Sequence, residues 1–111
     1  MADTTAAPEV TLDQLQAHLL DNTTVIDVRE ISEYVEGHIP GAVPVPMGQL
    51  PSHVGELNTD DPVIVVCASG NRSAAMTDFL RNAGFDAYSV AGGTSAWAGS
   101  GRPIVTGSGI A

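Results

Sequence analysis

Residues 63–73 read Val-Ile-Val-Val-Cys-Ala-Ser-Gly-Asn-Arg-Ser, and this stretch decides the fold. Its first four residues are continuously apolar, as is typical of a central parallel strand covered on both faces. The strand ends at Cys67, a short loop containing Gly70 follows, and a helix is predicted to open near Arg72 or Ser73. A strand, loop and helix in this order indicate an α/β fold.

Strands and helices alternate on both sides of this stretch. Further strands are predicted at 24–28, 42–46 and 86–90, with a brief one at 9–10, and the prolines of 42–46 favour an edge position. Helices are predicted at 12–20, 32–36, 73–83 and 94–98, with a weak one at 48–55. We therefore expect a three-layer α/β/α fold whose central, mostly parallel sheet has about five strands. Residues 1–8 are predicted to be a disordered lead-in, 9–105 one domain and 106–111 a flexible tail.

The composition limits what the protein can do. The chain has 111 residues, 43% of them hydrophobic, which suits a single packed domain. Its net charge is −9, from 13 acidic residues against four arginines, with no lysine. Because such a surface repels phosphates and anionic lipid, nucleic acids and membranes are unfavourable partners. The start has no signal-peptide pattern, and the longest apolar run, 62–68, is too short to span a bilayer. A cytoplasmic setting is the expectation.

Cys67 is the single cysteine, so an internal disulfide and a multi-thiolate metal site are both excluded. We expect no metal and no cofactor. The loop after Cys67 leads into a helix N-terminus, where backbone N–H groups and the helix dipole stabilise anions, the thiolate itself included. Cys67 is therefore the candidate nucleophile, expected to be ionised and open to solvent. The alternative is an inert core cysteine, but the position at a strand-to-helix turn beside Gly70 and Arg72 favours reactivity.

Three segments together resemble the rhodanese family of single-domain sulfurtransferases, from about residue 11 to 103. One is Val25-Ile26-Asp27-Val28-Arg29 with Gly37-His38-Ile39-Pro40-Gly41-Ala42, and another is Ala91-Gly92-Gly93 followed by Trp97. The third is Cys67-Ala68-Ser69-Gly70-Asn71-Arg72-Ser73, which follows the pattern Cys-x-x-Gly-x-Arg-Ser/Thr. The resemblance implies the rhodanese-like fold and a persulfide mechanism, in which Cys67 takes sulfur from a donor such as thiosulfate and passes it to cyanide or a thiol.

The length of the loop separates the related activities. Four residues stand between Cys67 and Arg72, whereas the phosphatases and arsenate reductases that the fold resembles carry one more, which widens the ring of amides for a tetrahedral oxyanion. The resemblance therefore favours sulfur transfer, and thiosulfate over mercaptopyruvate as the small-molecule donor. A protein thiol is a second candidate donor or acceptor. A non-catalytic, rhodanese-like binding module remains the main alternative, and a monomer or weak dimer is expected.

The other residues of the loop have assigned or open roles. Ala68, Ser69, Gly70 and Asn71 are expected to bind anions through their amides. For Arg72, contact with the substrate anion and pairing with a surface acid remain equally open. Ser73 is expected to cap the following helix rather than to contact the sulfur.

Two residues on a neighbouring strand are expected to support the loop. Asp27 is predicted to accept from nearby backbone N–H groups, and Arg29 to pair with an acid such as Glu33. His38 is expected to be a structural hydrogen-bonder.

Overall fold

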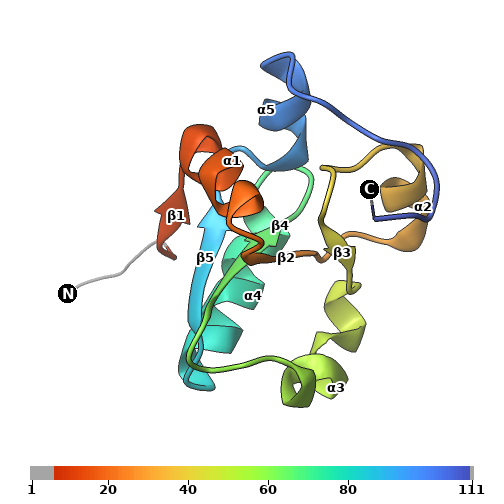
Figure 1. Cartoon of the computed structure of the whole chain (residues 1–111). Helices are drawn as coiled ribbons and strands as arrows, with labels where there is room; N and C mark the ends of the chain where they lie inside the picture. The colour runs from red at the N-terminus through yellow and green to blue at the C-terminus, as the bar shows by residue number, and fades with distance from the viewer. Residues whose placement is uncertain (1–6, 111) are drawn as a thin grey trace.

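The computed structural model describes residues 7–110. Five strands form one sheet in the order β1-β5-β4-β2-β3, and every pair is parallel. They are β1 (Glu9–Val10), β2 (Thr24–Asp27), β3 (Val43–Pro44), β4 (Pro62–Val66) and β5 (Asp86–Val90). The strand at 42–46 is shorter than predicted but lies at the edge, and 62–66 lies at the centre, as expected (Figure 1).

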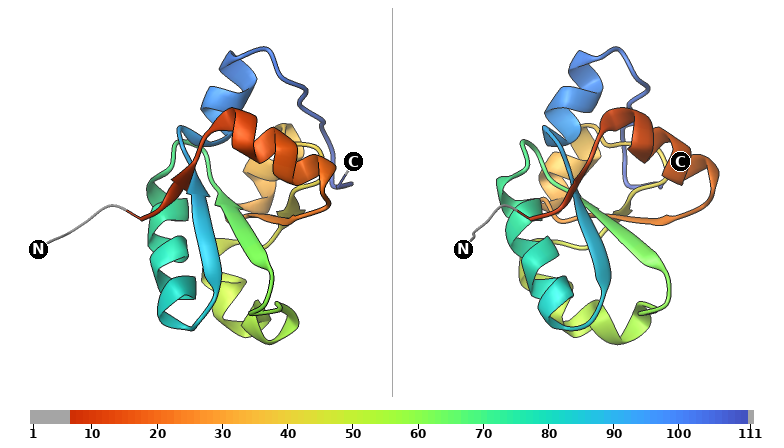
Figure 2. Two further views of the ribbon diagram at one scale, coloured as in Figure 1. Left: turned by 60° about the vertical axis from the view of Figure 1, so that its left-hand side comes forward. Right: turned by 90° about the vertical axis from the view of Figure 1, so that its left-hand side faces the viewer.

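Helices cover both faces of this sheet (Figure 2). They are α1 (Leu12–Leu20), α2 (Ile31–Glu36), α3 (Leu50–His53), α4 (Asn71–Asn82) and α5 (Gly93–Gly99), with short 3-10 turns at Met47–Gln49 and Val54–Glu56 on either side of α3. The predicted three-layer α/β/α architecture with a parallel five-stranded sheet is confirmed.

The core is divided by the alternation of side chains along β4. Val63, Val65 and Cys67 face one cluster with Leu80 of α4. Ile64 and Val66 face a second cluster, which contains Leu15 of α1 and Trp97 of α5. The direction of Cys67 therefore follows from its place in the register of the strand.

The start of α1 is as predicted. Thr11 Oγ1 accepts from the amide of Gln14, and Gln14 Oε1 accepts from the amide of Thr11, which completes a capping box. Leu15 is fully buried, but Leu20 is 81% exposed and lies outside the core.

Both ends of the described chain are hydrogen-bonded to the domain. Residues 1–6 of the predicted lead-in lie outside the described residues, but Ala7 is buried and the carbonyl of Pro8 accepts from Ser89 N. At the other end, residue 105 forms a bridge with His38, and a ring nitrogen of His38 lies 2.7 Å from the carbonyl oxygen of Gly109 in the predicted tail. The fully buried His38 is thus a structural hydrogen-bonder, as predicted, and it holds the tail against α2.

Candidate active site

The loop after β4 surrounds the sulfur of Cys67 with hydrogen-bond donors. The amides of Gly70 and Ser73 donate to Sγ over 3.1 and 3.3 Å, and Ser73 Oγ lies 3.4 Å from it. Burial raises the pKa of the Cys67 thiol, but the Ser73 hydroxyl and the amides of Ser73, Gly70 and Ser69 lower it, and the net pKa lies below the ordinary value. Backbone amides of the loop therefore converge on the sulfur.

The exposure of the sulfur is not as expected. Cys67 is only 1% exposed and belongs to the core cluster on the α4 side of the sheet. The prediction of an open thiol was wrong because Cys67 continues the inward alternation of Val63 and Val65 by one more step. The sulfur therefore lies at the floor of the loop, and the surface above it belongs to other residues.

Helix α4 begins at Asn71, two residues before the predicted start. Gly70 takes the N-cap position with φ at +112°, a left-handed conformation that favours glycine. Ser73 consequently lies inside the first turn and does not cap the helix. Its buried hydroxyl lies 2.7 Å from Ser89 Oγ of β5 and contacts the sulfur of Cys67, the role that the sequence analysis ranked second.

The N-terminus of α5 supports the loop from the other side. Thr94 N donates to the carbonyl of Cys67 over 2.8 Å, and Ser95 N to that of Ala68 over 2.9 Å. A Cβ on Gly93 would lie 2.5 Å from the first of these oxygens and 2.6 Å from the second. Only glycine permits this approach. In the sequence, Gly93 belongs to the Ala91-Gly92-Gly93 segment of the family resemblance and was given no role of its own, although a Gly-Gly pair before a helix was the available signal.

Asp27 and Arg29 lie at the same edge of the sheet as Cys67 and form a buried ion pair. Arg29 donates from Nε and Nη2 to both carboxylate oxygens of Asp27 over 2.8–3.1 Å, and from Nη2 to the carbonyl of Gly37. Asp27 also accepts from the backbone amide of Arg29, as predicted. The predicted pairing of Arg29 with Glu33 is wrong, because the nearer carboxylate of Asp27 occupies its guanidinium.

Glu33 instead pairs with Arg72. Two parallel hydrogen bonds of 2.8 and 2.9 Å join the guanidinium to the carboxylate. The hydrogen bond from Arg72 is the main cause that lowers the pKa of Glu33 from 4.5 to about 2, and the carboxylate raises the pKa of Arg72. Two roles were left open for Arg72, and pairing with an acid is the one seen in the structure. The remaining loop residues, Ser69 and Asn71, are exposed.

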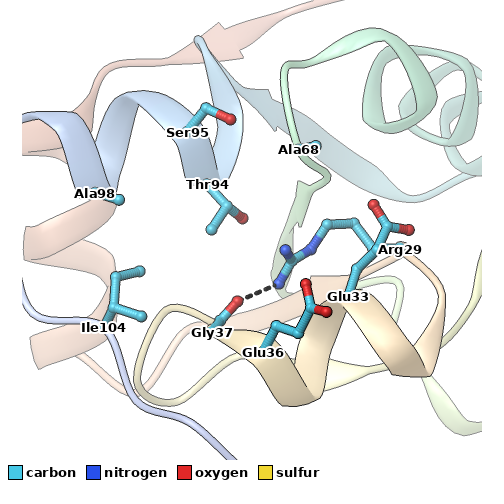
Figure 3. Close-up of a pocket in the computed structure, with 9 residues that line it drawn as sticks. All are labelled: Arg29, Glu33, Glu36, Gly37, Ala68, Thr94, Ser95, Ala98 and Ile104. Atoms are coloured by element: carbon cyan, nitrogen blue, oxygen red, sulfur yellow. Dashed lines mark hydrogen bonds between the residues drawn. The ribbon is translucent and has the colours of Figure 1, made fainter.

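A cavity of about 340 Å³ lies beside the loop, between α2 and α5 (Figure 3). Loop residue Ala68 forms part of its wall, and so does Glu33. Its full lining is Arg29, Glu33, Glu36, Gly37, Ala68, Thr94, Ser95, Ala98 and Ile104. The cavity is therefore lined by the loop after Cys67, by α2 and by α5.

Residues 7–110 lack two features that would indicate other kinds of site. They contain no cluster of three or more His, Cys, Asp or Glu side chains suited to a metal ion. No helix among them is long and apolar enough to cross a membrane.

Fold and site together define a class of protein. It is a parallel α/β domain with a cysteine in an amide-lined loop at the carboxyl edge of its sheet. Comparison with known proteins narrows this class. The family model described as "Rhodanese-like domain" matches residues 11–100. The chain belongs to this family, as the sequence motifs predicted.

Individual relatives agree with this assignment. A sulfurtransferase of Allochromatium vinosum is 34% identical over 100 residues, covering 87% of this chain and 94% of that protein. The crystal structure of a rhodanese-related protein from Thermoplasma volcanium is 34% identical, covers 88% of this chain and 97% of that chain, and superposes with a TM-score of 0.81.

A longer relative shares only this domain. The Bacillus subtilis (strain 168) protein named "Putative sulfur carrier protein YrkF" is 34% identical over 95 residues, which is 83% of this chain. The match covers 51% of YrkF, so the chain spans about half the length of that relative.

Proposed function

We propose that this protein is a sulfurtransferase that carries sulfur as a persulfide on Cys67. The observation that carries the proposal is the pair of backbone amides, from Gly70 and Ser73, that donate to Sγ. They stabilise the thiolate as the resting nucleophile, without a general base. The same reaction class is supported by the sulfurtransferase of A. vinosum, because its similarity to this chain extends over 94% of that protein.

The reaction is a pair of displacements at sulfur. The Cys67 thiolate attacks the outer sulfur of thiosulfate, the S–S bond of the donor breaks, and sulfite leaves with the bonding electrons. Cys67 then holds an S–S⁻ group. A nucleophilic acceptor, cyanide or a thiolate, attacks the terminal sulfur and regenerates the Cys67 thiolate, so no external oxidant or reductant is consumed.

Thiosulfate is proposed as the small-molecule donor because of the loop. The ring from Cys67 to Arg72 has six residues, and a narrow ring of N–H groups suits a terminal sulfur better than a tetrahedral phosphate. We propose that the amides of Ala68, Ser69, Gly70 and Asn71 line this ring, with Asp27 and Arg29 holding the neighbouring strand end in place. A free thiolate is stable in a reducing compartment such as the cytoplasm, which is the proposed setting.

The intact mass of the protein tests the proposal. Incubation with thiosulfate is expected to add one sulfur to the wild type and none to Cys67→Ala, and subsequent cyanide should remove it with release of thiocyanate. A wild type that gains no sulfur from thiosulfate or from a persulfide donor contradicts the proposal.

The burial of Cys67, at 1% exposure, is the observation that favours the alternative of a non-catalytic binding module. Reagents of graded size separate the two. If the loop admits a donor, iodoacetamide alkylates Cys67 in the folded protein, and folding slows a bulky maleimide more than it slows iodoacetamide when each rate is compared with that of the same reagent on the unfolded protein. A thiol that reacts only as fast as the protein unfolds supports the binding module. Hydrolysis of an aryl phosphate by the wild type indicates a phosphatase instead.

A further inference from the structure

The positive charges near Cys67 are already neutralised within the chain. The chain has no lysine, and each of its four arginines forms an ion pair with a carboxylate. The two arginines at the site, Arg29 and Arg72, are held by Asp27 and Glu33. Within residues 7–110, no unpaired lysine or arginine therefore faces a substrate.

One acid in the wall of the cavity has no such partner. Glu36, at the end of α2, lines the cavity, is exposed, and forms no ion pair among the described residues. Because the Asp27–Arg29 and Glu33–Arg72 pairs are each neutral, Glu36 leaves the cavity with a net negative charge. The overall charge of −9 adds to this field.

The cavity also holds a hydroxyl without a partner. Thr94 is 7% exposed, and its Oγ1 has no hydrogen-bond partner in the described structure. Its side chain projects from α5 into the space opposite Gly37 and Arg29 (Figure 3). Thr77 is the other buried hydroxyl without a partner among the described residues, but it does not line the cavity. A ligand in the cavity can therefore give Thr94, and not Thr77, the hydrogen bond that it lacks.

We propose that this cavity is the acceptor site, and that it receives a peptide or protein thiol with a lysine or arginine close to its cysteine. The proposal rests on the sulfurtransferase function given above and adds the class of acceptor. Glu36 pairs with the basic side chain, Thr94 Oγ1 hydrogen-bonds to the peptide, and Ala68 places the acceptor sulfur beside the loop. The acceptor thiolate takes the terminal sulfur of the Cys67 persulfide, and the Cys67 thiolate leaves.

The test uses three short peptides that differ only beside their cysteine, which is flanked by Lys, Gln or Glu. The Cys67 persulfide is first formed with thiosulfate and verified by intact mass, and its loss to each peptide is then timed. Rates are compared per thiolate, because a neighbouring lysine also lowers the pKa of the peptide thiol. The expected order is Lys, then Gln, then Glu, with about two- to fivefold between neighbours at low salt and less at high salt.

Two variants identify the group responsible. Glu36→Gln is expected to remove most of the preference for the Lys peptide, and Glu36→Lys to reverse the order. Glu56→Lys is the matched control, since it makes the same charge change in the exposed turn before β4, at the opposite end of that strand from Cys67. Thr94→Val is expected to slow all three peptides by a similar factor.

The outcomes are distinct. Equal rates for the three peptides, or a preference that Glu36→Lys and Glu56→Lys change equally, overturn the acceptor site while leaving sulfur transfer intact. Failure to form the persulfide in the first step contradicts the proposed function itself, and the acceptor site with it.

Discussion

The cradle around the sulfur, formed by residues 67–73, and the rim beside it, formed by the Asp27–Arg29 and Glu33–Arg72 pairs, are polar in different ways. The groups that contact Sγ in the cradle are backbone amides and one buried hydroxyl. The rim consists of full charges that neutralise one another. Fixed dipoles stabilise the thiolate without binding it as a counter-ion, so the sulfur stays available as a nucleophile. The paired charges position the surrounding elements.

The largest effect is expected at the support of the cradle. Gly93→Ala places a Cβ against the carbonyls of Cys67 and Ala68 at a residue whose φ is +64°. Strain and overpacking together should cost about 2–5 kcal/mol in the free energy of unfolding, measured with urea. Gly99→Ala in the same helix is the control, because nothing lies within 4 Å of its Cβ. Equal stabilities of the two variants contradict the close approach of α5 to the loop.

The next effect concerns the hydroxyl beside the sulfur. Ser73→Ala removes a hydroxyl that lowers the pKa of Cys67, so this pKa should rise and the thiolate fraction at any pH below it should fall. The pH dependence of iodoacetamide alkylation measures this, since Cys67 is the single cysteine.

A second buried hydroxyl provides the control for this experiment. Thr77 lies one turn further along α4, is also fully buried, and its Oγ1 has no hydrogen-bond partner among the described residues. Thr77→Val should therefore leave the alkylation profile of Cys67 unchanged. If Thr77→Val moves the profile as far as Ser73→Ala does, general loosening of the core is the cause instead.

A smaller effect is expected at the rim. Glu33→Gln keeps an acceptor for the amide of Glu30 but removes the ion pair with Arg72. Because both partners are about one-third exposed, the cost at pH 7 should be about 1 kcal/mol or less. The pKa of Glu33 is lowered in the folded state, so this stability is complete above pH 4.5 and lost as the pH falls towards about 2.

Urea unfolding at several pH values measures this dependence. The stabilities of wild type and Glu33→Gln should converge over that range, whereas Glu56→Gln, at an exposed acid without an ion pair, should differ little from wild type throughout. A difference between wild type and Glu33→Gln that is independent of pH assigns the cost to packing.

The smallest effect is long-range. With a net charge of −9 and its arginines paired, the protein should repel a dianion such as thiosulfate. The apparent affinity for thiosulfate is therefore expected to rise with added salt at low ionic strength, by steady-state kinetics. An affinity that falls steeply with salt indicates an unpaired cation at the donor site and contradicts the neutral rim.

The sequence predicted the local features closely. The first helix has the bounds that were predicted for it, 12–20, and the central strand appears as an uninterrupted apolar run. The amides that converge on Cys67 come from residues within six positions of it. Such contacts depend on short-range geometry and on the hydrophobic pattern, both of which are written in consecutive residues.

The tertiary structure alone decided the partners that are distant in sequence. Glu33 and Arg72 are 39 positions apart, and Ser73 meets Ser89 because β5 lies beside β4. The burial of the sulfur depended on the register of β4 within the sheet. The docking of the tail depended on His38, which contacts Gly109 from 71 positions earlier in the chain. The residue types allowed several acids to pair with each arginine, and only the packing of the elements brought one of them within hydrogen-bonding distance.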